Sequence, residues 1–83
     1  MKTDEITMKL RDIVKTYLPE DVKPEAIQMN SHLMMDLGIN SAHLVDIVLD
    51  VEDAFDITLD EKDMEAMQTV EAAVRIVNEK LKA

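Results

Sequence analysis

Ser41 is the residue of this chain best placed to do chemistry. It follows Gly38, the only glycine in the sequence, and Asn40. Glycine reaches positive φ without a steric penalty, so Gly38 predicts a tight turn. Asparagine is a favoured N-cap, because its side chain accepts a hydrogen bond from a free backbone N–H group. We therefore expect Ser41 in the first turn of a helix with its hydroxyl facing solvent. Taken alone, such a serine is most often an ordinary helix-start residue.

The residues around Ser41 do not favour an enzyme. His43 lies two positions away, but a serine nucleophile needs an oriented base and an oxyanion hole, and two adjacent side chains supply neither. His32 and His43 lie on opposite sides of the serine without the fuller constellation that a zinc site requires. The order of acidic residues also departs from that of a calcium-binding loop. We expect no catalytic residue and no metal site in this chain.

Helical periodicity places Ser41 within a bundle of four helices. We expect a first helix capped by Thr3 and ending before Pro19, and a second helix from Ser41 to Phe55. A short third helix follows the N-cap Asp60, and a fourth follows Thr69. Their apolar stripes are Ile6, Leu10, Ile13, Val14 and Tyr17; Leu44, Ile47, Val48, Val51 and Phe55; Met64 and Met67; and Val70, Ala73, Val74, Val77 and Leu81.

Residues 19–40 are predicted to form a long connection, with a short helical turn at residues 24–27. Four apolar residues are expected to attach this loop to the bundle: Ile27, Leu33, Met35 and Leu37. A loop of this length in a small domain is often functional. The chain is thus predicted to be one all-α domain, residues 1–83, with three longer helices, one short third helix and a long first loop.

The composition narrows the classes of partner. The formal net charge is −9 over 83 residues, which disfavours nucleic acid and anionic membrane surfaces and favours partners with basic surfaces. The chain has no cysteine, so any thiol chemistry must come from a prosthetic group. No apolar run is long enough to span a bilayer, and the first residues lack a signal-peptide core. We expect a soluble, cytoplasmic monomer.

The segment Asp36-Leu37-Gly38-Ile39-Asn40-Ser41, followed by an acidic amphipathic helix, resembles the acyl carrier proteins. Their motif is Asp-Ser-Leu preceded by Asp-Leu-Gly, and the resemblance extends over residues 33–77. In that family the first two long helices are joined by a long, packed loop. The family's serine carries phosphopantetheine, donated by coenzyme A through a separate phosphopantetheinyl transferase with Mg²⁺. The resemblance implies that Ser41 is the attachment point and that the arm's thiol holds acyl groups as thioesters.

The same resemblance implies two further sets of residues. Acyl-transferring or condensing enzymes with basic docking patches are the expected partners, and the second helix is the expected recognition element. The predicted partner-binding residues are Asn40, Ala42, Asp46, Leu49, Glu52, Asp53 and Glu61. Leu49 is an apolar residue among carboxylates, the arrangement of a binding hot spot. The hypothetical pocket for the acyl chain comprises Leu44, Val48, Met64, Met67, Ala73 and Val74.

The motif departs from the family at three positions. The usual Asp-Ser-Leu is Asn40-Ser41-Ala42 here, and His43 stands where carrier proteins often have an acid. These changes favour a specialised carrier over the housekeeping carrier of fatty acid synthesis. The cargo is left open between fatty acyl, lipid or polyketide-type units and aminoacyl units. The alternative outside the carrier class is an unmodified, acidic helical interaction module.

Overall fold

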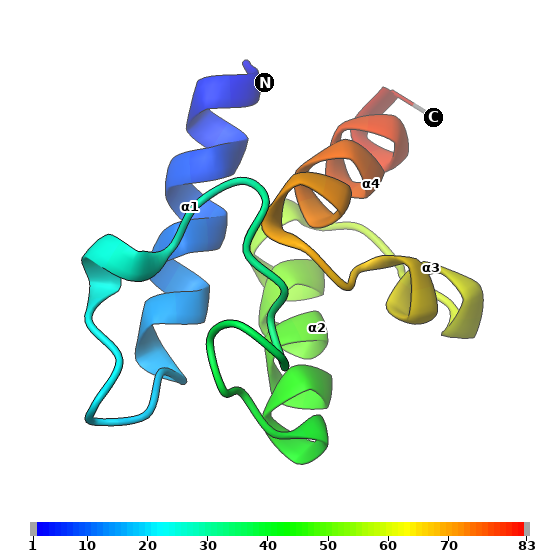
Figure 1. Cartoon of the computed structure of the whole chain (residues 1–83). Helices are drawn as coiled ribbons and strands as arrows, with labels where there is room; N and C mark the ends of the chain where they lie inside the picture. The colour runs from blue at the N-terminus through cyan, green and yellow to red at the C-terminus, as the bar shows by residue number, and fades with distance from the viewer. Residues whose placement is uncertain (1, 83) are drawn as a thin grey trace.

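The computed structural model describes residues 2–82. In this part of the chain four α-helices are present: α1 at Thr3–Thr16, α2 at Ser41–Phe55, α3 at Glu61–Ala66 and α4 at Val70–Lys82 (Figure 1). A 3₁₀ turn, η1 at Pro24–Ala26, interrupts the long first connection. The only β-type pairing among these residues is an isolated bridge between His32 and Thr69. The predicted all-α bundle with one short third helix is confirmed.

Side-chain caps fix the starts of three helices as predicted. The Asn40 side chain caps α2, and the Thr69 hydroxyl accepts a hydrogen bond from the Ala72 N–H at 3.1 Å in the first turn of α4. Asp60 and Asp63 form a reciprocal capping box at the start of α3, in which each side chain accepts from the other's backbone N–H. Such caps satisfy N–H groups that have no partner inside the helix.

The prediction that Thr3 caps α1 is wrong. The N-cap is Lys2, which has an extended backbone and makes no side-chain capping hydrogen bond. Its carbonyl accepts from the N–H groups of both Glu5 and Ile6 at 3.1 Å. Thr3 is consequently inside the helix, where its carbonyl accepts a hydrogen bond from the Thr7 hydroxyl.

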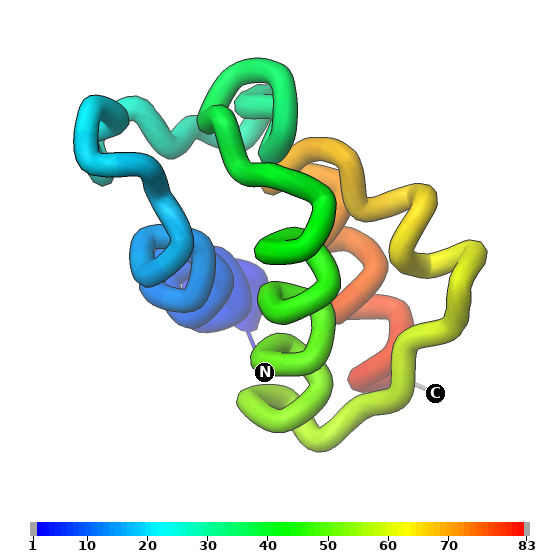
Figure 2. The backbone as a smooth tube through the Cα atoms, turned by 90° about the horizontal axis from the view of Figure 1, so that it is seen from below, coloured from blue at the N-terminus to red at the C-terminus, as the bar shows by residue number. Residues whose placement is uncertain are grey.

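The three longer helices bury one apolar face each in a common core. Ile6, Leu10 and Val14 line it from α1, Ile47, Val48, Val51 and Phe55 from α2, and Val70, Ala73, Val74, Ile76 and Val77 from α4. Each fully buried aliphatic side chain of this kind contributes about 1.5–3 kcal/mol through removal from water. Helix α1 packs against both α2 and α4. Figures 1 and 2 place α1 and α3 on opposite sides of α2.

The loop between α1 and α2 contributes four buried residues to the core: Ile27, Leu33, Leu37 and Ile39. Met35 was expected among them, but its side chain is 83% exposed. The segment makes a helical turn, in which the N–H groups of Asp36 and Leu37 both donate to the His32 carbonyl. Residues four apart then share a face, so Leu33 and Leu37 point inward while Met35 points out.

Candidate functional serine at the start of α2

Ser41 is the first residue of α2, and its side chain is exposed. The Asn40 backbone is extended, and its side-chain Oδ1 accepts from the His43 N–H at 2.8 Å. That bond satisfies one donor of the first turn. The N–H groups of Ser41 and Ala42 also lack acceptors inside the helix because they belong to its first turn. The Ser41 hydroxyl thus lies at a rigid, partly positive helix end.

The chain contains two serines, and their surroundings differ sharply. Ser31 is 6% exposed, and its hydroxyl donates to the Ala26 carbonyl at 3.1 Å while accepting from the Gln28 N–H at 3.0 Å. Ser31 is therefore a structural residue of the loop. Ser41 is the serine that another protein can reach.

Gly38 makes the turn that brings the chain to Ser41. Its φ is +71°, in the region that disfavours side chains. A Cβ built on Gly38 would lie 3.4 Å from Cγ of Pro19, which is ordinary van der Waals contact. The backbone conformation, more than crowding, requires glycine at this position.

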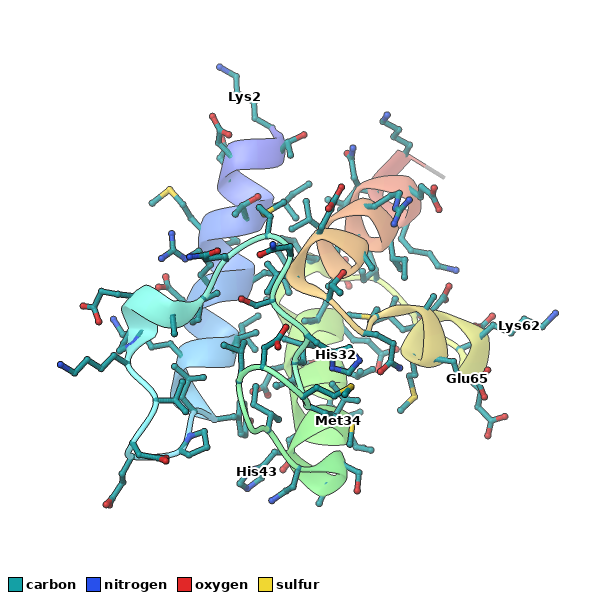
Figure 3. All side chains as sticks on the ribbon, viewed as in Figure 1. Lys2, His32, Met34, His43, Lys62 and Glu65 are labelled. Atoms are coloured by element: carbon teal, nitrogen blue, oxygen red, sulfur yellow. The ribbon has the colours of Figure 1, made fainter. Side chains whose placement is uncertain are left out.

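His32 organises the turn before Gly38. Its Nδ1 accepts from the N–H groups of Met34 and Met35 at 3.2 and 3.1 Å, and its own N–H donates to Asp36 Oδ2 at 2.7 Å. Together the two side chains satisfy backbone N–H groups at the start of a single helical turn. His32 and Met34 are labelled in Figure 3. His32 was weighed only as a possible zinc ligand, and its capping of this turn was not predicted.

Backbone hydrogen bonds attach the same loop to the start of α4. The Leu33 N–H donates to the Gln68 carbonyl at 2.8 Å, and the Val70 N–H donates to the Ser31 carbonyl at 3.1 Å. The Glu71 N–H donates to the Met29 carbonyl at 2.8 Å. The loop leading to Ser41 is consequently held by α4 as well as by its own turn.

Tyr17 connects the end of α1 to the middle of α2. Its hydroxyl donates to Asp50 Oδ2 at 2.5 Å, and its ring centroid lies 5.5 Å from that of His43. The hydrogen bond to Asp50 raises the pKa of Tyr17 to about 12, with burial and the negative charges of Asp50 and Asp46 adding to the effect. The His43 side chain beside the start of α2 is labelled in Figure 3.

Most of the predicted partner-binding side chains are accessible. Asn40, Ala42, Asp46, Asp53 and Glu61 are exposed, and Leu49 is 53% exposed. Five of these six residues belong to α2 or its N-cap, and Glu61 begins α3. An exposed leucine on an acidic helix face is compatible with the predicted hot spot.

Glu52 differs from the other predicted contacts. Its side chain is half-buried, and Oε2 accepts from the Leu59 N–H at 2.7 Å. This carboxylate fixes the connection between α2 and α3. One of its oxygens is thereby already engaged within the molecule.

The six residues predicted to line the acyl pocket all belong to the apolar core or pack against it. Val48, Met67, Ala73 and Val74 are buried in the core, while Leu44 and Met64 are half-buried and pack against it. These residues come from α2, α4 and the region of α3. They share the apolar core with many other residues.

Sequence reasoning missed three exposed apolar residues close to the serine in sequence. Met34 and Met35 lie on the turn before Gly38, and Val45 lies on α2; all three are exposed. Val45 carries a recognisable signal, because it is an apolar residue that falls outside the helix's buried stripe. Met34 and Met35 become recognisable only once the helical turn of this loop is known.

Comparison with known proteins agrees with this geometry. Residues 9–77 match the family described as the phosphopantetheine attachment site. The acyl carrier protein of Petrotoga mobilis is 31% identical over 81 residues, which cover 98% of this chain and 93% of that protein. The acyl carrier protein of Exiguobacterium is 32% identical over 81 residues, 98% of this chain and 100% of the relative. The acyl carrier protein of Desulforapulum autotrophicum is 43% identical over 61 residues, which cover 74% of this chain and 73% of that protein.

A small helical bundle with an attachment-site match of this extent defines a carrier protein that holds phosphopantetheine covalently. The chain belongs to the acyl carrier protein family. Members of this class are carriers and not enzymes. None of the helices within residues 2–82 has the length and apolar character needed to cross a membrane.

Proposed function

We propose that Ser41 carries the phosphopantetheine arm. The observation that carries this proposal is the contrast between the two serines: Ser41 is exposed at a helix start, whereas Ser31 is buried with its hydroxyl in two hydrogen bonds. The site suits a phosphodiester, because a helix N-terminus with free N–H groups favours negative charge. The terminal thiol of the arm would supply the thioester chemistry that a chain without cysteine lacks.

Fragmentation of the loaded protein by tandem mass spectrometry tests the position of the arm. The protein is incubated with coenzyme A, Mg²⁺ and a broad-specificity phosphopantetheinyl transferase. The added mass is expected on the fragment ions that contain residue 41 and on none that contain Ser31 alone. An added mass localised to Ser31 or to a threonine would contradict the assignment.

We further propose that α2 docks the carrier onto its loading transferase and onto acyl-transferring or condensing enzymes with basic entrances. The exposed carboxylates Asp46, Asp53 and Glu61, together with Ala42 and Leu49, are the proposed contacts. Exposed ion pairs contribute about 0.2–1 kcal/mol each, so binding would be weak, fast and sensitive to salt. Glu52 would contribute mainly by holding the α2–α3 connection in place.

Charge reversal tests this docking surface. Asp46→Lys should slow loading at low salt. The difference in loading rate from the wild-type chain should shrink as salt is added. Glu5→Lys on α1 is a matched control, because it changes the net charge equally at an exposed site outside the proposed surface. Equal slowing by both variants would show that only the overall charge matters.

The apolar interior formed by Leu44, Val48, Met64, Met67, Ala73 and Val74 is the proposed shelter for the acyl chain. Half-buried Leu44 and Met64 mark the part of this set that is closest to solvent. Each methylene withdrawn from water would stabilise the sheltered state by about 0.8 kcal/mol. Nuclear Overhauser contacts between an attached acyl chain and the Met64 and Met67 methyl groups would support the proposal that the chain is sheltered inside the bundle. An acylated structure with the chain outside the bundle would contradict it.

The proposed cellular role is a cytoplasmic, monomeric carrier of acyl intermediates between enzymes of fatty acid, lipid or polyketide-type synthesis. The combination of Asn40, Ala42 and His43 at the attachment site favours a specialised set of partner enzymes. Asn40 retains the cap without the negative charge of the family's aspartate. The identity of the enzyme that acylates the loaded protein would separate acyl from aminoacyl cargo.

A further inference from the structure

A cavity is lined by residues of α1 and of the η1 region. Figure 1 shows η1 on the side of α1 away from α3 and α4. Its volume is about 190 Å³, and its lining residues are Met8, Arg11, Asp12, Lys15, Pro24 and Ile27. None of these residues belongs to α2 or to the site around Ser41. Whatever occupies this cavity would therefore leave the proposed docking surface for transferases and acyl enzymes free.

The cavity combines an apolar floor with two unpaired cations. Ile27 is buried beneath it, whereas Met8 is 67% exposed at its edge. Arg11 and Lys15 are exposed and four residues apart on α1, a spacing that places both on one face. Among residues 2–82 the only ion pair within 4.0 Å joins Asp63 and Lys80. Arg11 and Lys15 thus have no carboxylate partner, although Asp12 is also part of the lining.

This region also belongs to the less acidic part of the chain. Residues 1–35 hold five of the nine cationic residues and six of the eighteen acidic ones. Exposed Lys23 and Glu25 flank Pro24 and offset each other in charge. The lining itself has two cations and one carboxylate, in a chain whose net charge is −9. The cavity therefore has the opposite polarity to the acidic face of α2.

We propose that this cavity is a second docking site, which binds a segment of a partner protein that places a carboxylate beside an aliphatic side chain. The guanidinium of Arg11 and the ammonium of Lys15 would receive the carboxylate in charge-assisted hydrogen bonds. Met8, Pro24 and Ile27 would receive the aliphatic group, and an unbranched methionine adapts readily to different apolar shapes. The site selects acidic partner segments, whereas α2 selects basic ones.

Nuclear magnetic resonance titration of the full, unloaded chain tests the proposal without relying on Ser41. The probe is the peptide acetyl-Glu-Leu-Glu-Leu-amide at low salt, and its neutral counterpart is acetyl-Gln-Leu-Gln-Leu-amide. A contact of this size is expected to have a Kd in the millimolar range, so the titration extends to about 10 mM peptide. The amide signals of residues 8–15 and 24–27 should shift in a saturable manner with the acidic peptide and far less with the neutral one.

A matched pair of variants identifies the charges that matter. Arg11→Gln with Lys15→Gln should weaken binding of the acidic peptide by roughly tenfold, as expected for two exposed ion pairs. Lys62→Gln with Lys82→Gln removes the same charge from α3 and α4, and should leave the affinity unchanged. Figure 3 shows the Lys62 side chain projecting away from the bundle. Unchanged amide spectra away from the substitutions would establish that both variants are folded.

Three results would overturn the proposal. The first is the absence of shifts at residues 8–15 and 24–27, and the second is equal weakening in both double variants. The third is a change of the same signals when the protein alone is diluted, which would make a second copy of this chain the occupant. Saturable, charge-dependent shifts that are lost only with Arg11 and Lys15 would establish the site.

Discussion

Asn40 caps α2 as an aspartate would, but it adds no negative charge beside Ser41. Its Oδ1 caps α2 through the His43 N–H at 2.8 Å. An aspartate at this position would make the same hydrogen bond and would add a negative charge beside Ser41. Substitutions at residue 40 can therefore test separately whether the cap matters for stability and whether a negative charge matters for loading.

Asn40→Ala should lower the free energy of unfolding by about 1 kcal/mol, because it removes the cap of α2. Asn40→Asp should retain stability and should speed loading by a broad-specificity transferase. Urea unfolding measures the first effect, and the initial rate of mass gain with coenzyme A measures the second. Equal loading rates for the wild-type chain and the Asn40→Asp variant, at equal stability, would show that the charge at residue 40 is irrelevant to the transferase.

Tyr17 gives a prediction for alkaline pH. Its pKa is raised from 10.0 to about 12, chiefly by its hydrogen bond to Asp50. Because the folded protein holds the phenol proton more tightly than the unfolded chain, this contribution to stability is complete below about pH 10. It is lost as pH rises towards about 12.

Tyr17 is the only tyrosine, and the chain has no tryptophan, so tyrosinate absorbance reports on this residue alone. The folded protein should titrate well above the unfolded chain, and Asp50→Asn should bring the midpoint down. The free energy of unfolding should also fall more steeply above pH 10 in the wild-type chain than in the Tyr17→Phe variant. An ordinary tyrosine titration in the folded protein would show that the bond to Asp50 does not persist in solution.

At the scale of elements, the loop before Ser41 is a short structured unit and not merely a linker. The His32 and Asp36 side chains cap one helical turn, and Gly38 follows that turn with a positive φ. Two backbone hydrogen bonds, from the Val70 N–H to the Ser31 carbonyl and from the Leu33 N–H to the Gln68 carbonyl, join the loop to the start of α4. The position of Ser41 therefore depends on residues well before the recognisable motif.

His32→Ala should destabilise this turn by about 1 kcal/mol, the usual effect of removing a side-chain cap. His32→Asn should restore most of the loss, because asparagine also offers an acceptor to the first-turn N–H groups. Amide hydrogen exchange at Met34 and Met35 is the direct measurement. Faster exchange in the alanine variant alone is expected, whereas identical exchange in all three proteins would mean that His32 does not hold the turn.

The helices were predictable because their signals are local. The caps Asn40, Asp60 and Thr69 and the apolar stripes of α1, α2 and α4 follow from short-range chemistry. The loop was less predictable, since its helical turn exposes Met35, which was expected to help attach the loop to the bundle. The Tyr17–Asp50 bond joins residues 33 positions apart, and no local pattern indicates such a pair. Ser41 and its exposure were predictable, whereas the engagement of Glu52 by the Leu59 N–H was not.

At the scale of the whole molecule, charge is divided unevenly along the chain. Residues 36–83 hold twelve of the eighteen acidic residues but only four of the nine cationic ones. The acidic part includes α2, with Ser41 at its start. An uneven field of this kind orients the carrier towards a basic partner before contact is made.

Self-repulsion within this acidic bundle should make its stability depend on salt. Raising monovalent salt from low to moderate concentration should increase Tm, because screening weakens repulsion among carboxylates. For a chain of this size, each 1 kcal/mol of relieved repulsion corresponds to about 4–8 °C in Tm. Calorimetry at several salt concentrations measures the effect. A Tm that falls with added salt would mean that specific attractions outweigh the repulsion.

The intact mass of the chain after incubation with coenzyme A, Mg²⁺ and a phosphopantetheinyl transferase shows whether Ser41 carries the arm. The wild-type chain and the Ser31→Ala variant are compared with the Ser41→Ala variant. We predict a gain of one phosphopantetheine in the first two proteins and no gain in Ser41→Ala. A gain that persists in folded Ser41→Ala would contradict the account, because another residue would then carry the arm.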